Sequence, residues 1–497
     1  MSYLGISAGF HDASISVIDY DGEIRFAAHA ERYSKQKNDP SLNTDIFNDA
    51  LRHGGLVTHI AYYEKPWLKQ LRNLYSGSGI DWKRIFTYQV LDREIPPRAW
   101  RTIGTGIPQS SHGHHLSHAA AGFQTSPFDD ATVVVIDAIG EFDTISIWHA
   151  EYDKKGVARY KRLWRQRYPH SVGLFYSAMT QRAGLKPNED EYILMGMSAY
   201  GRPDFNVFAE FVKDKRSIEF YDNLHLGCEE YRPEMTDFQI AASAQYTVEQ
   251  LLHEIMARAR QVGRSKNLVY MGGVALNCAA NEHLGNYFDS IWIMPNPGDA
   301  GSSLGAAALA YGKQVNWSHP YLGTNIEGDY PVNALLDELL AGKIVGVASG
   351  RAEFGPRALG NRSLLADPRG PEIKDKVNEI KRRQKFRPFA PVILEEYVNE
   401  YFEMPKNFPT SDYMQVVATC KRPTEFPAII HHDGTSRVQT VPKDSASGIR
   451  QLLEKWFVMT GCPMLLNTSL NIKGEPMVND RSDADRFQQR YGVRVVS

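Results

Sequence analysis

The chain has 497 residues, of which 42% are hydrophobic and 23% charged, and its formal net charge is −2. A chain of this length is expected to form two or three domains, because single cores stop growing at a smaller size. The composition is that of a globular protein and excludes disordered and fibrous classes. The near-neutral charge argues against a general binder of nucleic-acid backbones, although a local basic groove remains compatible with it.

The cysteines are widely scattered and form no CxxC pair, which favours reduced thiols over a zinc or redox motif. The sequence shows neither a basic-then-apolar leader nor an uncharged apolar run of about 18 residues. We therefore expect a cytoplasmic protein with no membrane association.

The N-terminal region predicts a strand meander. Apolar runs at 3–8, 13–19 and 23–30 predict three strands, and the turn at 9–12 between the first two contains His11. Such a turn can bring backbone N–H groups against a phosphate, but without a Walker-type motif it is equally well a plain turn. A helix near 44–52 and a strand near 59–63 are expected to follow.

A run of small residues at 113–123 predicts a helix that carries His114, His115 and His118. His114 and His118 are four residues apart, so both imidazoles lie on one helix face at a spacing suited to a shared metal ion. An alanine-rich packing helix with incidental histidines is the alternative, and the pair taken alone favours that alternative.

Two acidic residues at predicted strand ends strengthen the metal hypothesis. Segment 131–156 repeats the strand, turn and strand of the N-terminus, which indicates an internal duplication. Duplicated halves of this kind are typical of actin-like and sugar-kinase-like ATPases. Asp137 ends the apolar run of this repeat, and Asp299 follows a strand at 290–295 and begins a helix of small residues. Ligands of α/β sheets bind at such strand ends, so both carboxylates can join the histidines.

A glycine pair marks a candidate nucleotide site. A long amphipathic helix at 240–262 leads to a buried strand near 267–271, which runs into Gly272 and Gly273 and then a helix. Paired glycines at this junction let a nucleotide approach the backbone and the helix N-terminus.

The segment 316–331 is rich in proline, glycine and polar residues, and we place a domain boundary there. The chain beyond it carries many arginines beside phenylalanine and proline, which favours a partly enclosed anion site over a solvated surface. These arginines are Arg351, Arg357, Arg362, Arg369, Arg382, Arg383 and Arg387. Later motifs add Arg437, Thr468 and Ser469, which suit a small phosphorylated ligand.

Several motifs in this order resemble the O-carbamoyltransferases of the nodulation and antibiotic-tailoring type, over residues 3–480. They are HHLSHA, VVIDAIGE, GMSAYG, GGVALNCAAN, NPGDAGSSLGAA, FGPRALGNRS, FRPFAP, DGTSRVQTV and NTSLNIKGEP. The resemblance implies an α/β protein with an actin/sugar-kinase-like (ribonuclease H-like, duplicated) domain over 1–325 and a YrdC-like domain over 332–497. It also implies that carbamoyl phosphate and ATP yield a carbamoyl adenylate, from which the carbamoyl group passes to an acceptor hydroxyl.

The resemblance further assigns roles to individual residues. The metal ligands are His114, His118, Asp137 and Asp299, with iron(II) or another divalent first-row metal as the ion. Nucleotide contacts fall on Gly272, Gly273 and Asn277. Carbamoyl phosphate and ATP fall on Lys381, Arg387, Arg437, Thr468 and Ser469, with Mg²⁺ on the triphosphate. The catalytic residues are His11, Lys37 and Arg357. His11 is the candidate base, although a turn histidine bonded to the backbone is the alternative.

The chain departs from the family pattern at Ala138, Leu470 and Ile193, none of which is a proposed ligand. A threonylcarbamoyl-type tRNA-modifying enzyme and a non-catalytic actin-like ATP-binding scaffold are the competing functions. The acceptor stays open among sugars, natural products and hydroxymethylated nucleobases; direct nucleic-acid binding and a homodimer stay open too. An aromatic and basic region at 61–100, which includes Tyr62, Trp67, Tyr75, Trp82 and Tyr88, is either a stacking surface or core.

Overall fold

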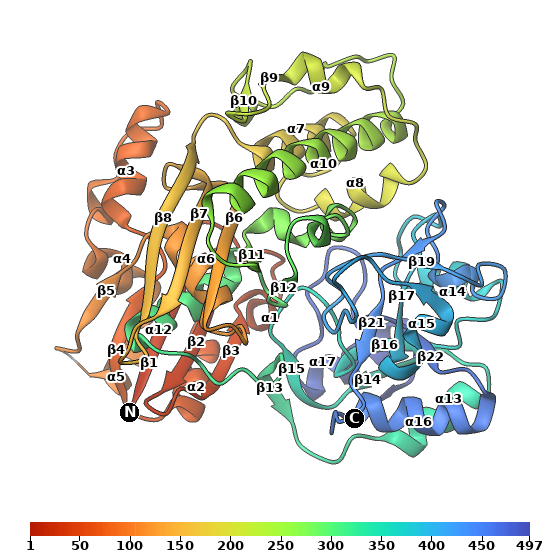
Figure 1. Ribbon diagram of the computed structural model, residues 1–497. Coiled ribbons are helices and arrows are strands. Elements are labelled where there is room, and N and C mark those ends of the chain that lie inside the picture. The colour runs from red at the N-terminus through yellow and green to blue at the C-terminus, as the bar shows by residue number, and fades with distance from the viewer. Residues whose placement is uncertain (105) are drawn as a thin grey trace. The chain divides into compact units, whose positions relative to one another are not determined.

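The computed structural model describes residues 1–104 and 106–497 (Figure 1). The chain divides into two compact units. The first comprises Met1–Ala30 and Asn38–Ser318, and the second comprises Glu31–Lys37 and His319–Ser497. A short N-terminal segment therefore belongs to the unit that is otherwise built from the C-terminal part of the chain.

The first sheet of the first unit has the strand order β3-β2-β1-β4-β5. Its strands are β1 (Ser2–Ser7), β2 (Ser14–Asp19), β3 (Ile24–His29), β4 (Val57–Tyr62) and β5 (Gln109–Ser111). The predicted meander is confirmed, because β1, β2 and β3 pair antiparallel, whereas β4 and β5 continue the sheet in parallel. A helix, α2 (Thr44–Gly54), separates β3 from β4.

The second sheet of this unit repeats that topology, in the order β8-β7-β6-β11-β12. Its strands are β6 (Asp130–Gly140), β7 (Asp143–Tyr152), β8 (Ala158–Arg167), β11 (Asn267–Met271) and β12 (Ser290–Trp292). The first three again form an antiparallel meander and the last two again add in parallel. The predicted duplication and the α/β fold class are thereby confirmed. Strand β8 was not predicted, because this edge strand has no continuous buried face to give an apolar alternation.

Two helices of small residues cross closely inside the first unit. They are α6 (His114–Phe123) and α12 (Ser302–Tyr311). A Cβ on Gly305 would lie 1.8 Å from the Ser117 carbonyl oxygen, so only glycine permits this separation. The small residues noted in the sequence thus serve close helix packing.

Longer helices complete the unit. The predicted helix near 240–262 is α10 (Asp237–Val262), which begins with a capping box between Thr236 and Gln239. It runs beside α7 (Val172–Arg182) and α8 (Glu191–Ser198) (Figure 1).

Between α8 and α10 in the chain, a smaller lobe contains α9 (Asn206–Phe211), β9 (Val212–Asp214) and β10 (Glu219–Phe220). The region after β4 forms α3 (Pro66–Tyr75), η1 (Trp82–Arg84), α4 (Thr87–Glu94) and α5 (Pro97–Ile103).

The second unit is built on a six-stranded sheet in the order β21-β17-β22-β16-β14-β23. The strands are β14 (Val345–Ala348), β16 (Arg362–Ala366), β17 (Ala390–Leu394), β21 (Gln439–Val441), β22 (Met464–Ser469) and β23 (Val495–Val496). The central pairs are antiparallel, and β21 and β23 add in parallel at the edges. The unit is therefore also α/β.

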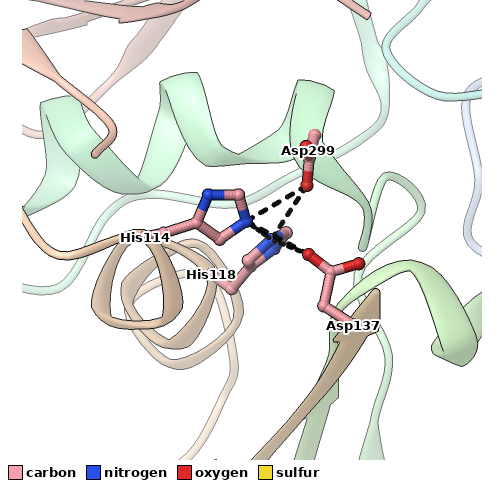
Figure 2. A group of neighbouring side chains, drawn as sticks. All are labelled: His114, His118, Asp137 and Asp299. Carbon is pink, nitrogen blue, oxygen red and sulfur yellow. Dashed lines mark hydrogen bonds and ion pairs between the residues drawn. The ribbon is translucent and has the colours of Figure 1, made fainter. Parts of the chain in front are cut away.

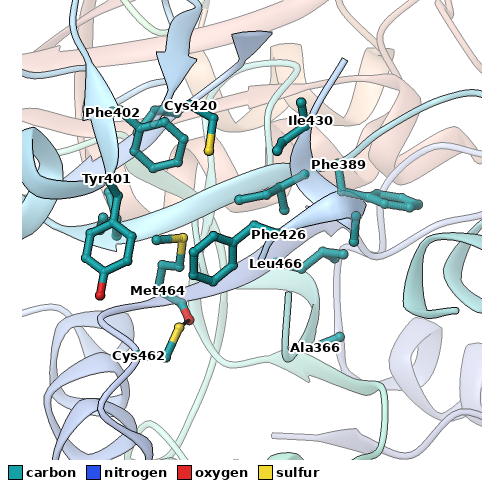
Figure 3. Close-up of a cluster of buried hydrophobic side chains, with 14 of the residues drawn as sticks. Ala366, Phe389, Tyr401, Phe402, Cys420, Phe426, Ile430, Cys462, Met464 and Leu466 are labelled. Carbon is teal, nitrogen blue, oxygen red and sulfur yellow. Dashed lines mark hydrogen bonds between the residues drawn. The ribbon is translucent and has the colours of Figure 1, made fainter. Parts of the chain in front are cut away.

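Alternate residues of these strands serve two separate cores, as the pleat of a sheet requires. Leu365 and Leu465 pack against α13 (Val332–Leu340) and α16 (Gly448–Thr460). Leu466 points to the opposite face and joins an aromatic cluster that includes Phe389, Phe402 and Phe426 (Figure 3). The sheet is thus covered on both faces.

The segment α1 (Glu31–Ser34) is bound to the second unit by charged side chains. The buried Arg32 guanidinium donates to the Gly355 carbonyl at 2.8 Å, and Lys35 pairs with Asp483.

No helix in the described residues combines the length and the apolar composition needed to cross a membrane.

Candidate functional site

Four buried side chains converge in the first unit (Figure 2). His114 and His118 lie one turn apart on α6, Asp137 lies in β6, and Asp299 begins the turn η5 (Asp299–Gly301) that leads into α12. One ligand atom from each residue lies within 4.8 Å of the others. The shortest distances are 3.1 Å from His114 Nε2 to Asp137 Oδ2 and 3.2 Å from His118 Nε2 to Asp299 Oδ1. The structure therefore brings together all four residues that the resemblance assigned as metal ligands.

The chemistry of this group suits a cation. The Nδ1 atom of His118 faces the Pro297 carbonyl at 3.1 Å, which directs Nε2 toward the other three ligands. The two Nε2 atoms lie 3.1 Å apart, and a carboxylate oxygen lies beside each of them. Lone pairs of two imidazoles and two carboxylates can thus point at one centre, a donor set suited to a first-row divalent metal.

The pKa values of the cluster show how strongly its charges interact. Burial alone lowers the pKa of His114, but the charge of Asp299 and hydrogen bonds to both aspartates outweigh it and hold the pKa well above its usual 6.5. Burial raises the pKa of Asp137, yet the two histidines hold it well below its usual range. Without a cation the imidazoles thus carry the compensating protons, and a divalent metal would displace those protons on binding.

A further carboxylate, Glu64, lies behind His114. Its Oε2 atom is 3.9 Å from His114 Nδ1, and its Oε1 atom pairs with Lys69 Nζ at 2.6 Å. Burial raises the pKa of Glu64, whereas Lys69 and His114 lower it by more, so the carboxylate stays charged. Glu64 was not predicted, although it directly follows the strand expected near 59–63 and is thus an acidic residue at a strand end, like Asp137.

His11 lies beside the metal cluster. Its Nδ1 atom is 3.0 Å from Asp12 Oδ2 and its Nε2 atom is 3.7 Å from Asp299 Oδ2. Burial lowers the pKa of His11, but the bond to Asp12 and the charge of Asp299 raise it to about 9. His11 is therefore protonated near neutral pH in this arrangement, and a cation bound beside it would oppose that protonation.

The predicted nucleotide residues follow β11. Gly272 has a φ of +93°, and a Cβ there would lie 2.2 Å from the Ile136 carbonyl oxygen, so this position needs glycine. The Gly273 amide donates to Asp137 Oδ1 at 3.3 Å, which places the glycine pair directly beside a candidate metal ligand. The Asn277 side chain caps α11 (Cys278–Asn281) and bonds to Gln245, so its amide already has partners within the protein.

The second unit contains a buried cation without an anionic partner. Lys381 is 4% exposed, and its Nζ atom donates to the Ser469 carbonyl at 2.5 Å, to the Ser469 hydroxyl at 3.2 Å and to Asn471 Oδ1 at 3.0 Å. Burial, together with the charges of Arg383 and Arg387, lowers the pKa of Lys381 well below its usual 10.5. No carboxylate pairs with this ammonium group in the described residues, so its charge has no opposite charge beside it, although its three hydrogens are already donated to oxygen atoms of Ser469 and Asn471.

Three other residues of the second unit were predicted to bind carbamoyl phosphate and ATP together with Lys381 and Ser469. Thr468 is adjacent to Ser469 on β22, and Arg387 lies close enough to act on the charge of Lys381. Arg437 follows β20 (Thr435–Ser436), and its half-buried guanidinium has an Nε atom without a hydrogen bond in the described residues. Asn471 was missed as a ligand of Lys381, although it lies inside the motif NTSLNIKGEP.

The remaining predicted catalytic residues also lie in the second unit. Arg357 is half-buried and follows β15 (Gly350–Glu353). Lys37 ends the segment Glu31–Lys37, where its Nζ atom pairs with Glu31 at 2.8 Å. His11 belongs to the first unit, so the three predicted catalytic residues are divided between the two units.

Two family models match the chain. The model described as Carbamoyltransferase N-terminus matches residues 2–225 and 210–308, and that described as Carbamoyltransferase C-terminus matches residues 336–497. These matches span most of the sequence, and the motifs on which the resemblance rests lie within them. The chain belongs to the carbamoyltransferase family and is a transferase enzyme.

Individual relatives agree with this assignment. The chain is 30% identical to nodulation protein NolNO of Sinorhizobium fredii, over 95% of this chain and 76% of the relative. It is 28% identical to the 3'-hydroxymethylcephem-O-carbamoyltransferase of Amycolatopsis lactamdurans, over 97% of this chain and 95% of that enzyme. Among solved structures it is similar to HypF of T. kodakarensis, with 13% identity and a TM-score of 0.37 over 62% of this chain and 47% of that one. The structural likeness is too low to support an argument about function.

Proposed function

We propose that the protein is an ATP-dependent O-carbamoyltransferase that forms carbamoyl adenylate and passes its carbamoyl group to an acceptor hydroxyl. The observation that carries the proposal is the buried set of two histidines and two aspartates on α6, β6 and η5, in a chain of the carbamoyltransferase family. A scaffold without turnover gives no reason to hold four ionisable side chains together in the interior, because such burial is costly.

The second unit is proposed to make the adenylate, as a YrdC-like domain. Carbamoyl phosphate and ATP are both strongly anionic, so their approach requires cations that also neutralise the leaving phosphate and pyrophosphate. The buried ammonium of Lys381 and the nearby Arg387 supply positive charge in this unit. Thr468 adds a hydroxyl donor beside Ser469, whose own hydroxyl donates to Asn471. Mg²⁺ on the triphosphate would complete the charge balance. Water cleaves the bond between the carbamate oxygen and phosphorus of carbamoyl phosphate, which releases phosphate and leaves carbamate. A carbamate oxygen then attacks the α-phosphorus of ATP and displaces pyrophosphate, so the products are carbamoyl-AMP, phosphate and pyrophosphate.

The first unit is proposed to perform the transfer. The acceptor oxygen attacks the carbamoyl carbon, the bond from that carbon to the AMP phosphate oxygen breaks, and AMP leaves while the hydroxyl proton passes to a base. A divalent metal held by His114, His118, Asp137 and Asp299 would polarise the carbonyl group. His11, hydrogen-bonded to Asp12 and adjacent to Asp299, is in place to bind the anionic leaving group when protonated or to accept the proton when neutral.

The test is direct. Metal-loaded protein is incubated with ATP and carbamoyl phosphate, and pyrophosphate and carbamoyl-AMP are followed by chromatography and mass spectrometry. We expect both products, and their absence would contradict the proposal. A parallel reaction with threonine and bicarbonate in place of carbamoyl phosphate separates the threonylcarbamoyl alternative, which predicts an adenylate only from those substrates.

A further inference from the structure

The region after β4 exposes an unusual number of aromatic side chains. Trp67 and Tyr75 on α3 are 48% and 69% exposed, Trp82 on η1 is 72% exposed, and Phe86 and Tyr88 at the start of α4 are 56% and 53% exposed. Of the aromatic residues noted in this region of the sequence, Tyr62 is core, whereas the other four are surface. Exposed apolar side chains that gather in one region mark an interaction site, whereas singly scattered ones are ordinary.

The exposed rings are connected physically to the metal cluster. The Asp81 amide, next to η1, donates to Gln70 on α3 at 2.8 Å, and Arg84 of η1 reaches the Gly9 carbonyl at 3.5 Å. Beside Gly9, the Phe10 ring is 57% exposed and lies 4.6 Å from the His11 ring, centroid to centroid. The surface formed by Phe10, α3, η1 and α4 is called the aromatic surface below, and it ends at His11, which neighbours Asp299.

Lys69 joins the same surface to the interior of the site. Its Nζ atom pairs with Glu64, which lies behind the metal ligand His114, and it also lies 5.5 Å from the centroid of the Phe10 ring. Phe10 is thereby held between a cation and His11 with much of its ring still open to solvent. This position suits a ring that contacts the acceptor.

The charge of the aromatic surface indicates its ligand. Residues 65–101 contain eight basic and three acidic residues, although the whole chain has a net charge of −2. Of the acidic residues, Glu94 forms an ion pair with Arg84 at 3.3 Å. Lys83, Arg93 and Arg98 are exposed and pair with no carboxylate in the described part of the chain. Unpaired cations among exposed rings therefore favour a polyanion that also has flat faces.

We propose that the aromatic surface binds single-stranded nucleic acid and presents a hydroxyl of that strand to His11 and the metal cluster. Rings stack on unpaired bases while cations follow the phosphates, and this combination is typical of proteins that bind single strands. The exposed rings come from three helical elements, and those of Phe86 and Tyr88 are stacked with centroids 5.7 Å apart. A protein partner fits less well, because lysine is depleted from protein interfaces and this region contains Lys65, Lys69 and Lys83.

This inference rests on the proposed function for the identity of the acceptor, but its binding step can be measured alone. Full-length, metal-loaded protein is titrated into fluorescein-labelled strands of about 20 nucleotides, with no ATP or carbamoyl phosphate, and fluorescence anisotropy is recorded. DNA and RNA strands are tested separately, and the corresponding duplex is tested as a competitor. We expect single strands to bind and the duplex to compete weakly.

Two variants on separate elements test the rings. Trp82→Ala and Tyr88→Ala should each weaken binding about tenfold or more, because each removes one stacking partner. Lys83→Gln combined with Arg93→Gln should reduce the slope of log K against log salt by about 0.7 for each cation removed. Tyr221→Ala and Arg264→Gln are the matched controls, since both side chains are exposed in other segments of the same unit, after β10 and after α10, and they should leave affinity unchanged.

Two outcomes would overturn the proposal. One is single-strand affinity that is undetectable at low salt or identical in wild type and ring variants of unchanged melting temperature. The other is concentration-dependent dimerisation in light scattering that Trp82→Ala abolishes, which would identify the aromatic surface as a contact between copies of the chain. Carbamoyl-AMP formation is assayed separately without a strand, so a failure there contradicts the proposed function and leaves the binding result intact.

Discussion

At the scale of single residues, the four candidate metal ligands were predictable from the sequence and the residues around them were not. His114, His118, Asp137 and Asp299 lie in motifs that can be read from sequence, and the structure places them together. Glu64, after β4, comes close to His114 on α6, and Phe10, in the turn after β1, comes close to Lys69 on α3. Both contacts join segments far apart in the sequence, so no local pattern predicts them.

Glu64→Gln should weaken metal binding about 10- to 100-fold, because a neutral amide orients and polarises the His114 imidazole less than a carboxylate does. Isothermal titration with divalent metals and metal content after dialysis measure this without any activity assay. Glu234→Gln, which changes an exposed glutamate of the same unit, is the control. Equal metal affinity in Glu64→Gln and wild type would show that Glu64 does not support His114.

Lys381 should make phosphate binding dependent on pH. Its lowered pKa means that the ammonium loses its proton as pH rises through a value below 10.5, so affinity for carbamoyl phosphate should fall in that range. Between the lowered pKa and 10.5, Lys381 is more protonated in the unfolded chain than in the native chain. The contribution of Lys381 to the free energy of unfolding therefore rises with pH in this range. Calorimetric titrations of carbamoyl phosphate across pH measure the first effect.

Two substitutions of Lys381 test whether its charge causes the pH dependence. Lys381→Met should abolish the pH-dependent part of the affinity, and Lys381→Arg should retain binding without loss at alkaline pH, because arginine stays protonated. A wild-type affinity that rises with pH would contradict the assignment of Lys381 as the anion-binding cation.

At the scale of elements, sequence patterns located most strands and helices near the site, because their apolar periodicity reflects burial. What they did not reveal is how closely α6 and α12 cross. That separation depends on Gly305 facing the backbone at Ser117, and it sets the position of Asp299 relative to His118.

Gly305→Ala should therefore lower the free energy of unfolding by about 1–3 kcal/mol or more, because the added methyl group meets backbone that has to move. The shift of α12 should also weaken metal binding. Denaturant unfolding and metal titration measure the two effects. The matched control is Gly196→Ala on α8, where a Cβ meets nothing within 4 Å and where alanine should stabilise by about 0.5–1 kcal/mol. Equal stability of the two variants would contradict the close crossing.

At the scale of the whole molecule, the chain enters the second unit twice. The segment Glu31–Lys37 continues directly from β3 of the first unit, yet it belongs to the second unit. The sequence boundary near 316–331 gave no sign of this exchange, because a seven-residue segment is too short to show a composition of its own.

Arg32→Met should lower the stability of the second unit by about 1–3 kcal/mol, because it leaves the Gly355 carbonyl without its donor and removes the charge that faces Glu353. Because these contacts lie inside the second unit, calorimetry should show the transition of that unit at a lower temperature. Arg264→Met, at an exposed position of the first unit, should not change the melting profile. An unchanged profile in Arg32→Met would show that α1 contributes little to the second unit.

The sequence by itself determined the family, the duplicated α/β fold and the four candidate metal ligands that the structure brings together, because motif order and strand-end acids are local properties of the chain. Tertiary structure decided what surrounds them: the Glu64 and Lys69 layer behind His114, the unpaired ammonium of Lys381, and the aromatic surface that ends at His11. These features depend on distances between residues far apart in the chain and on which side chains remain exposed. Neither quantity is encoded in spacing or periodicity, since both are set by how the elements pack.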